Sequence, residues 1–436
     1  MIDPMTVTAR EIAAGVTAGK LHPRDVIEAY LDQIAAHEPA LHAFVWLDPE
    51  AARRRAEAVS IGPLAGVPFG IKDVFDTVDM PTGYGSVAYS GTRPSRDASA
   101  VHLARMAGGV AIGKTVTTEF ASAAPGLTCN PFDLDRTPGG SSSGSAAGLA
   151  AGFFPLAFGT QTAGSTVRPA SFCGVVGYTA SRGLIDRTGV KPLAESLDIV
   201  GLMARDVRDC ALLASVVARR AELAPTQEVI SLPRIGLFAH DLAETPSAAS
   251  IDILENVARI LEGVETLKTP DWWEGLGAAQ ADVFAWEASA ALGPERDLHW
   301  DVLKPRSHDF FARHEGITFE CWRAAIAKRE SATADLNTLF GDCDLIITQA
   351  APGEAPVGLG ATGVAAYNVR WTLLGAPSLS IPAGLGPSGM PIGVQLVARP
   401  GEDVKLLAYA TAIEDLLREA GVVARPDRVD ISDAVR

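Results

Sequence analysis

The amino-acid sequence predicts an α/β fold that begins with a helical segment. Apolar residues recur at helical spacing over about the first 60 residues. From about residue 65, short apolar runs alternate with helical stretches, the pattern of an α/β domain. No linker-like tract or internal repeat interrupts the 436 residues, of which 47% are hydrophobic and 20% charged. We therefore expect a single domain over residues 1–436.

The opening segment, residues 1–60, predicts helices over 6–19, 23–38 and 48–60. Pro23 suits the first turn of the second helix, because that position needs no backbone N–H. We therefore expect the chain to begin with a compact helical segment.

Buried strands and amphipathic helices are then expected to alternate to the end of the chain. The expected strands lie in VPFGIKDVF, GGVAIGKT, FFPLAFGT, GVVGY, RIGLFA, DLIITQ, PSLSIPAG and PIGVQLVA. The expected helices lie in DASAVHLARMA and SGSAAGLAAG and over 205–220, 246–262, 317–340 and 402–419.

Composition narrows the classes of partner. A net charge of −15 leaves no basic surplus for nucleic acid or an anionic membrane, so we expect a small-molecule substrate. The five cysteines form no CxxC pair, and no motif implies a metal or an organic cofactor. The N-terminus lacks a signal-peptide pattern, and the apolar stretch 146–159 is too short and broken to span a bilayer. We expect a cytoplasmic protein.

Three stretches could carry chemistry. Lys72 lies near the end of an expected buried strand, where burial would lower its pKa and leave a neutral amine able to act as a base. Ser141 lies in TPGGSSSGSAAGLAAG, which by itself is more typical of a helix N-cap. Ser165 lies in GTQTAGSTVRPASFCGVVG, whose turn could form an oxyanion hole. The competing interpretation of Lys72 is a surface lysine whose ammonium reaches solvent.

Taken together, these stretches resemble the amidase signature family, whose hallmark is a lysine, a serine in a GGSS turn and a second serine in a GGS turn. The spacing fits the family: Lys72 precedes Ser141 by 69 residues, and Ser141 precedes Ser165 by 24. KTVTTEFAS, YNVRWTLLGAPSLSIPAG and PIGVQLVARPGED extend the resemblance over nearly the whole chain. It implies a signature core over 65–200 and a large mixed β-sheet with helices on both faces.

The resemblance also implies a mechanism. Ser165 would attack the amide carbonyl and become acylated, and neutral Lys72 would remove its proton through Ser141. Ser141 would follow a cis peptide bond at Gly140–Ser141. The oxyanion hole would be formed by the backbone N–H groups of Thr162, Ala163, Gly164 and Ser165. Ala163 stands where many relatives have glycine, so it should fit only with a negative φ.

The sequence is most similar to malonamidase-type members, which share the GGSSSGSAA turn, the GTQT segment and an arginine three residues after the nucleophile. That arginine, Arg168, could pair with a carboxylate on a small acidic amide such as malonamate, or form a structural ion pair. Thr160, Gln161 and Ser142 are further expected substrate-binding residues. Relatives suggest a homodimer.

Other interpretations remain open. The chain could be the glutamine-hydrolysing subunit of an amidotransferase that works with a partner, or a binding protein without activity. Residues 108–115 match the P-loop pattern, but its middle is typical of a strand, not a loop. Residues 140–144 match a nucleophile elbow centred on Ser142, but no buried strand precedes them. Most of five tryptophans are expected in the core, namely Trp272, Trp273, Trp286, Trp300 and Trp322.

Overall fold

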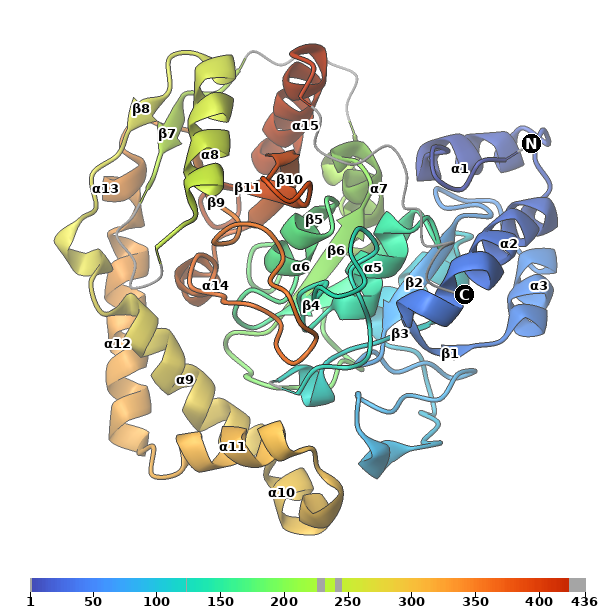
Figure 1. Cartoon of the computed structure of the whole chain (residues 1–436), viewed down its shortest axis with the longest axis horizontal. Helices are drawn as coiled ribbons and strands as arrows, with labels where there is room; N and C mark the ends of the chain where they lie inside the picture. The colour runs from blue at the N-terminus through green and yellow to red at the C-terminus, as the bar shows by residue number, and fades with distance from the viewer. Residues whose placement is uncertain (1, 123, 226–231, 240–244, 423–436) are drawn as a thin grey trace.

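A mixed sheet of 11 strands runs through the molecule (Figure 1). The computed structural model describes residues 2–122, 124–225, 232–239 and 245–422. In spatial order the strands are β1 (Phe44–Leu47), β3 (Val110–Thr115), β2 (Pro68–Lys72), β4 (Leu156–Gln161), β6 (Ile199–Ala204), β5 (Val176–Thr179), β10 (Ser378–Leu385), β11 (Pro391–Val397), β9 (Leu345–Gln349), β7 (Ile235–Leu237) and β8 (Glu265–Thr266). Strand β2 is parallel to β3 and β4, and β7 is parallel to β8 and β9, whereas the other neighbours are antiparallel. The predicted mixed sheet is confirmed.

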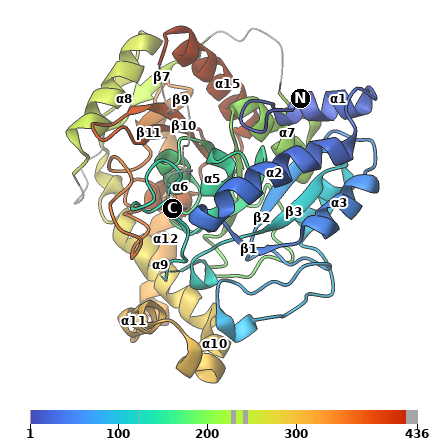
Figure 2. The same ribbon diagram turned by 45° about the vertical axis from the view of Figure 1, so that its right-hand side comes forward.

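Helices cover both faces of this sheet (Figures 1 and 2). They are α1 (Ala9–Thr17), α2 (Pro23–Leu41), α3 (Pro49–Glu57), α4 (Ser99–Met106), α5 (Ser143–Ala150), α6 (Val167–Phe172), α7 (Val207–Val217), α8 (Ala248–Leu261), α9 (Leu276–Ala291), α10 (Gly293–His299), α11 (Pro305–His314), α12 (Phe319–Ala334), α13 (Leu336–Phe340), α14 (Val369–Leu374) and α15 (Asp403–Glu419). Helices α5 and α6 pack against each other and the strands, and α7 packs with α4 and α15. The predicted α/β class is confirmed.

The opening helical segment forms as predicted. Helix α2 begins at Pro23, and the Asp48 side chain caps α3 by accepting a hydrogen bond from the Ala51 N–H. Strand β1 lies between these helices and pairs with β3, an element that the sequence patterns did not reveal.

Helix α5 is buried along its whole length because its side chains are small. A Cβ on Gly144 would lie 2.1 Å from the Ala43 carbonyl oxygen, so only glycine permits this approach. The close packing holds the preceding turn, residues 140–142, against the sheet.

Helices α9 to α12 form an arm that extends beyond the sheet, coloured yellow to orange at the lower left of Figure 1. The single helix expected over 317–340 ends at Asp335, which separates α12 from α13. The expectation that most of the five tryptophans lie in the core was wrong, because only Trp273 is buried. Trp322 of this arm is partly exposed, and its indole N–H donates to Glu287 Oε1 at 3.0 Å.

Within the described residues, no helix is long and apolar enough to cross a membrane. The same part of the chain holds no group of three or more His, Cys, Asp or Glu side chains arranged to bind a metal ion.

Candidate active site

Lys72 ends strand β2 and is completely buried. Its Nζ lies 2.7 Å from Ser141 Oγ and 2.6 Å from Thr160 Oγ1. Burial lowers the pKa of Lys72 well below its usual value of 10.5, and the negative charge of Asp198 opposes this only in part. Burial therefore favours the neutral amine, whose lone pair could accept a hydroxyl proton.

Ser141 lies between this amine and the second serine. Its peptide bond with Gly140 is cis, as the resemblance implied. The Ser141 carbonyl accepts a hydrogen bond from the Thr118 N–H at 3.3 Å, and the next N–H, of Ser142, donates to the Ser165 carbonyl at 3.3 Å. The backbone thus ties the turn that carries Ser141 directly to the residue expected to be the nucleophile.

Ser165 lies in the turn between β4 and α6, with 9% of its surface exposed. Its Oγ has no hydrogen-bond partner among the described residues, so the hydroxyl is free to turn towards Ser141 or a substrate. Hydrogen bonds between catalytic groups commonly tighten only when substrate is bound.

The turn of Thr162 to Ser165 is held through two of its carbonyl groups and the Thr162 hydroxyl. The Thr162 hydroxyl donates to Asp198 Oδ1 at 2.6 Å, and the Thr162 carbonyl accepts from Gln280 Nε2 at 3.2 Å. Thr372 Oγ1 donates to the Ala163 carbonyl at 2.8 Å. Within the described chain, none of the backbone N–H groups of residues 162–165 donates to a protein acceptor. These donors are available to a developing oxyanion.

Ala163 fits the turn as the sequence required, and the neighbouring Gln161, which ends β4, is held by hydrogen bonds inside the protein. Ala163 is not among the residues with positive φ, so its side chain is tolerated where relatives often have glycine. Gln161 accepts hydrogen bonds from the N–H groups of Thr166 and Val167 at 3.0 and 3.1 Å, which caps α6. Its Nε2 donates to Thr372 Oγ1 at 3.1 Å.

Three residues expected to contact substrate make contacts inside the protein, namely Gln161, as just described, Thr160 and Ser142. The Thr160 hydroxyl faces Lys72, and the Ser142 hydroxyl lies 3.3 Å from the Thr160 N–H and 3.4 Å from its carbonyl oxygen. Their contact with a substrate stays a prediction. The burial of Ser142 argues against a nucleophile elbow at residues 140–144, because this side chain lies fully buried against β4.

Arg168 lies in α6 beside the relay. Its Nη1 donates to the Gly363 carbonyl at 2.9 Å, and its Nη2 donates to the Gly140 carbonyl at 2.5 Å and to Thr362 Oγ1 at 3.1 Å. Burial lowers its pKa to about 10. No carboxylate of the described residues pairs with this guanidinium, and its buried Nε has no partner there. The structural ion pair considered from the sequence is thus not formed.

The P-loop interpretation is excluded by the position of Lys114. Residues 110–115 form strand β3 itself, and Lys114 Nζ lies 3.1 Å from Asp73 Oδ1 in the interior. A phosphate-binding loop would have to follow the strand.

Sequence reasoning missed the side chains that support the turn, namely Asp198, Gln280 and Thr372. Each is a single polar residue in an otherwise apolar or helical segment. Each also lies outside the signature turns in the sequence. Only their contacts in the folded chain identify them.

Known proteins are similar to this chain over most of its length. Residues 25–265 and 296–407 match the family described as amidase. A glutamyl-tRNA(Gln) amidotransferase subunit from Thermus thermophilus is 34% identical over 466 residues, covering 95% of this chain and 98% of its own. The corresponding chloroplastic/mitochondrial protein of Zea mays is 30% identical, covering 96% and 91%. Both are amidotransferase subunits rather than malonamidases, so the finer resemblance stays a prediction.

Solved structures show the same fold. A 6-aminohexanoate cyclic dimer hydrolase superimposes with a TM-score of 0.86 at 26% identity, covering 98% of this chain and 99% of that one. The peptide amidase of Stenotrophomonas maltophilia gives a TM-score of 0.81 at 26% identity, with the same coverage.

Proposed function

Because this chain belongs to the amidase family and is an amidohydrolase acting on amide C–N bonds, we propose that it works through an acyl-enzyme on Ser165. The observation that carries the proposal is the buried Lys72 amine 2.7 Å from Ser141 Oγ. A neutral lysine can accept the Ser141 proton at this distance, and burial favours the neutral form.

In the proposed reaction, Lys72 accepts the proton of Ser141 while Ser141 accepts that of Ser165. Ser165 Oγ then attacks the carbonyl carbon, and the C–N bond breaks as the relay returns a proton to the leaving nitrogen. Water enters, loses its proton to the same relay and releases the carboxylate product. Negative charge on the carbonyl oxygen is stabilised by the free N–H groups of residues 162–165, worth about 3 kcal/mol for each well-placed donor.

For the substrate, we propose a small acidic amide such as malonamate. Arg168 supports this class, because a buried guanidinium without a carboxylate partner would gain from binding one. Its Nε–H is the donor left without a partner, and a substrate carboxylate would have to approach it or replace the contact with Thr362.

A glutamine-hydrolysing subunit of an amidotransferase is the second candidate. It is favoured by the relatives, whose names describe such subunits and whose similarity covers nearly the whole chain. In that case the chain alone would release little ammonia and would copurify with a partner. The homodimer suggested by relatives would be tested by light scattering after size-exclusion chromatography.

Ammonia release from malonamate, acetamide, an aryl amide and glutamine tests both candidates. Wild-type protein is expected to release ammonia from malonamate, and Ser165→Ala and Lys72→Ala are expected to abolish this release. Little or no release from any of these amides by the isolated chain, together with copurification of a partner, would favour the amidotransferase. Unchanged turnover of malonamate by Ser165→Ala would contradict the proposed nucleophile.

A further inference from the structure

A pocket of about 570 Å³ lies beside the catalytic residues, at the same edge of the sheet. Lys72 and Thr115 are register partners at the ends of the parallel strands β2 and β3, and Thr115 pairs with Phe44 of β1. The pocket is lined by Asp73, Thr117 and the first residues of β1, but not by Lys72, Ser141 or Ser165. Ligands of α/β proteins commonly bind beyond the carboxyl ends of the strands. The location therefore suits a binding site separate from the catalytic serine.

One side of the pocket is apolar. Phe44, Val45 and Trp46 line it from β1, and Val87 and Leu127 line it from two loops. Val45, Val87 and Leu127 are 53%, 68% and 73% exposed, so three large apolar side chains meet solvent around one cavity. Clustered exposed apolar side chains mark binding surfaces more often than scattered ones.

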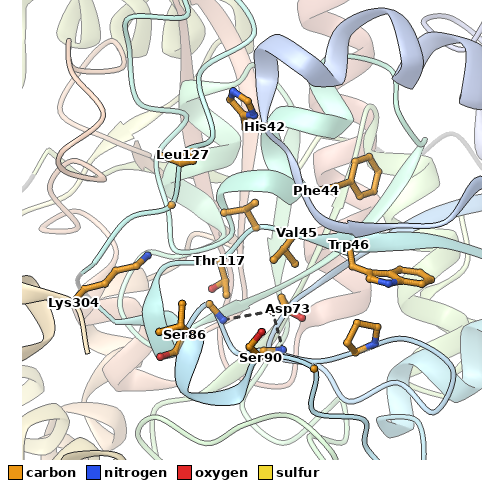
Figure 3. A pocket seen from close by; sticks show the side chains of 17 residues that line it. His42, Phe44, Val45, Trp46, Asp73, Ser86, Ser90, Thr117, Leu127 and Lys304 are labelled. Atoms are coloured by element: carbon orange, nitrogen blue, oxygen red, sulfur yellow. Dashed lines mark hydrogen bonds between the residues drawn. The ribbon is translucent and has the colours of Figure 1, made fainter. Parts of the chain in front are cut away.

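The other side carries a positive charge. Figure 3 shows Lys304 across the pocket from Trp46, with Thr117 between them. The Lys304 ammonium donates to the Pro125 carbonyl at 3.2 Å and forms no ion pair with a carboxylate of the described residues. Its own backbone N–H donates to Glu119 Oε2 at 3.0 Å, which fixes the residue at the pocket.

Two of the polar side chains between these two sides differ in whether their polar atoms already have hydrogen-bond or ion-pair partners. The carboxylate of Asp73 is engaged by Lys114 at 3.1 Å and by the Gly83 N–H at 3.1 Å, so it is not free to bind a cation. Thr117 Oγ1 is buried and has no hydrogen-bond partner in the described part of the chain. A ligand that placed a polar atom at Thr117 would satisfy this hydroxyl.

We propose that this pocket binds a small carboxylate with an apolar or aromatic tail. The carboxylate would pair with Lys304, and the tail would lie on Phe44, Val45 and Trp46. The volume is within the range of about 300–1,000 Å³ typical of small-molecule sites. A cation is disfavoured because Asp73, the only carboxylate among the described residues that line the pocket, is already paired.

Binding of 4-phenylbutyrate to the full chain, followed by ligand-observed NMR and calorimetry, tests the proposal. We expect a dissociation constant of about 1 mM or below, and about tenfold weaker binding of 4-phenylbutan-1-ol and of acetate. Lys304→Met should weaken the binding of 4-phenylbutyrate about tenfold. Lys268→Met, which removes an exposed lysine outside the pocket, should change nothing.

The catalytic site supplies the decisive comparison, since it could also take a carboxylate. If the pocket is the site, Ser165→Ala and Arg168→Met still bind the probe. Loss of binding in Arg168→Met with full binding in Lys304→Met would overturn the proposal, as would no binding to the wild type. If Lys304→Met folds poorly, Leu127→Glu serves as a second variant, because it places a negative charge at an exposed position of the same pocket. Leu127→Glu must then weaken the binding of the probe.

Discussion

Replacing Gln280 by methionine tests how the oxyanion turn is held. Gln280 Nε2 donates to the Thr162 carbonyl at 3.2 Å, and both residues are buried. Methionine has similar length but no donor, so the substitution leaves a buried carbonyl without its partner. Such a loss costs about 1–3 kcal/mol.

Part of this cost is expected to appear in catalysis. The Thr162 carbonyl belongs to the turn whose N–H groups are proposed to bind the oxyanion, and its release would let those donors move. If about 1 kcal/mol of the loss falls on the transition state, kcat falls about fivefold. KM should stay within about twofold, because the oxyanion forms only after the substrate is bound.

Steady-state kinetics with malonamate, together with thermal unfolding, measures both effects. Gln33→Met is the matched control, since Gln33 Nε2 makes the same kind of hydrogen bond to the Ala151 carbonyl at 2.8 Å, outside the turn. Both variants should lose similar stability, and only Gln280→Met should lose kcat. Equal loss of stability with an unchanged kcat in Gln280→Met would refute a positioning role.

Three further predictions concern ionisable side chains. Lys72→Met should abolish activity. Between the lowered pKa of the folded lysine and its usual value of 10.5, the unfolded wild type binds one proton more than the folded protein, so wild type loses stability as the pH falls. The gain in Tm of this variant over wild type should therefore be larger at pH 6 than at pH 9. Arg168→Met should lower kcat/KM for malonamate about 10- to 100-fold and for acetamide much less, as measured by ammonia release. Lys114→Met should cost about 3–5 kcal/mol in chemical unfolding, because it leaves the buried Asp73 carboxylate unpaired, and adding Asp73→Asn should recover part of that loss.

Each of these predictions has a contradicting result. A Tm difference for Lys72→Met that does not change with pH would mean that the folded lysine keeps its ordinary pKa. Equal losses on malonamate and acetamide in Arg168→Met would make the arginine a support for Gly140 and the loop at Thr362 only. No recovery of stability in the Lys114/Asp73 double variant would show that lost packing, not the unpaired charge, causes most of the destabilisation.

Much of the fold could be predicted because its strands are short apolar runs bounded by turns. The predicted strand around Lys72 is β2, and the lysine ends it as expected. Helix α9 was missed because its sequence, LGAAQADVFAWEASAA, is rich in alanine and shows little separation of polar and apolar faces. It packs against two separate hydrophobic clusters, so burial is not confined to one stripe.

The proposed catalytic residues could be found from the sequence, whereas the residues that support them could not. Lys72, Ser141 and Ser165 carry a family pattern at fixed spacing, and the structure brings Lys72 and Ser141 into contact. Asp198 and Gln280 approach Thr162 from separate segments, and no local pattern marks either residue. Their roles depend on contacts between distant parts of the chain, which only the folded structure shows.

The proposed relay is tested best by locating the acyl group. Wild-type protein turning over an aryl amide would be quenched in acid, digested and analysed by peptide mass spectrometry. We predict an acyl group on the peptide at Ser165, and none in Lys72→Ala treated in the same way. An acyl group on Ser142, or rapid turnover with no acylated peptide at all, would contradict the relay from Lys72 through Ser141 to Ser165.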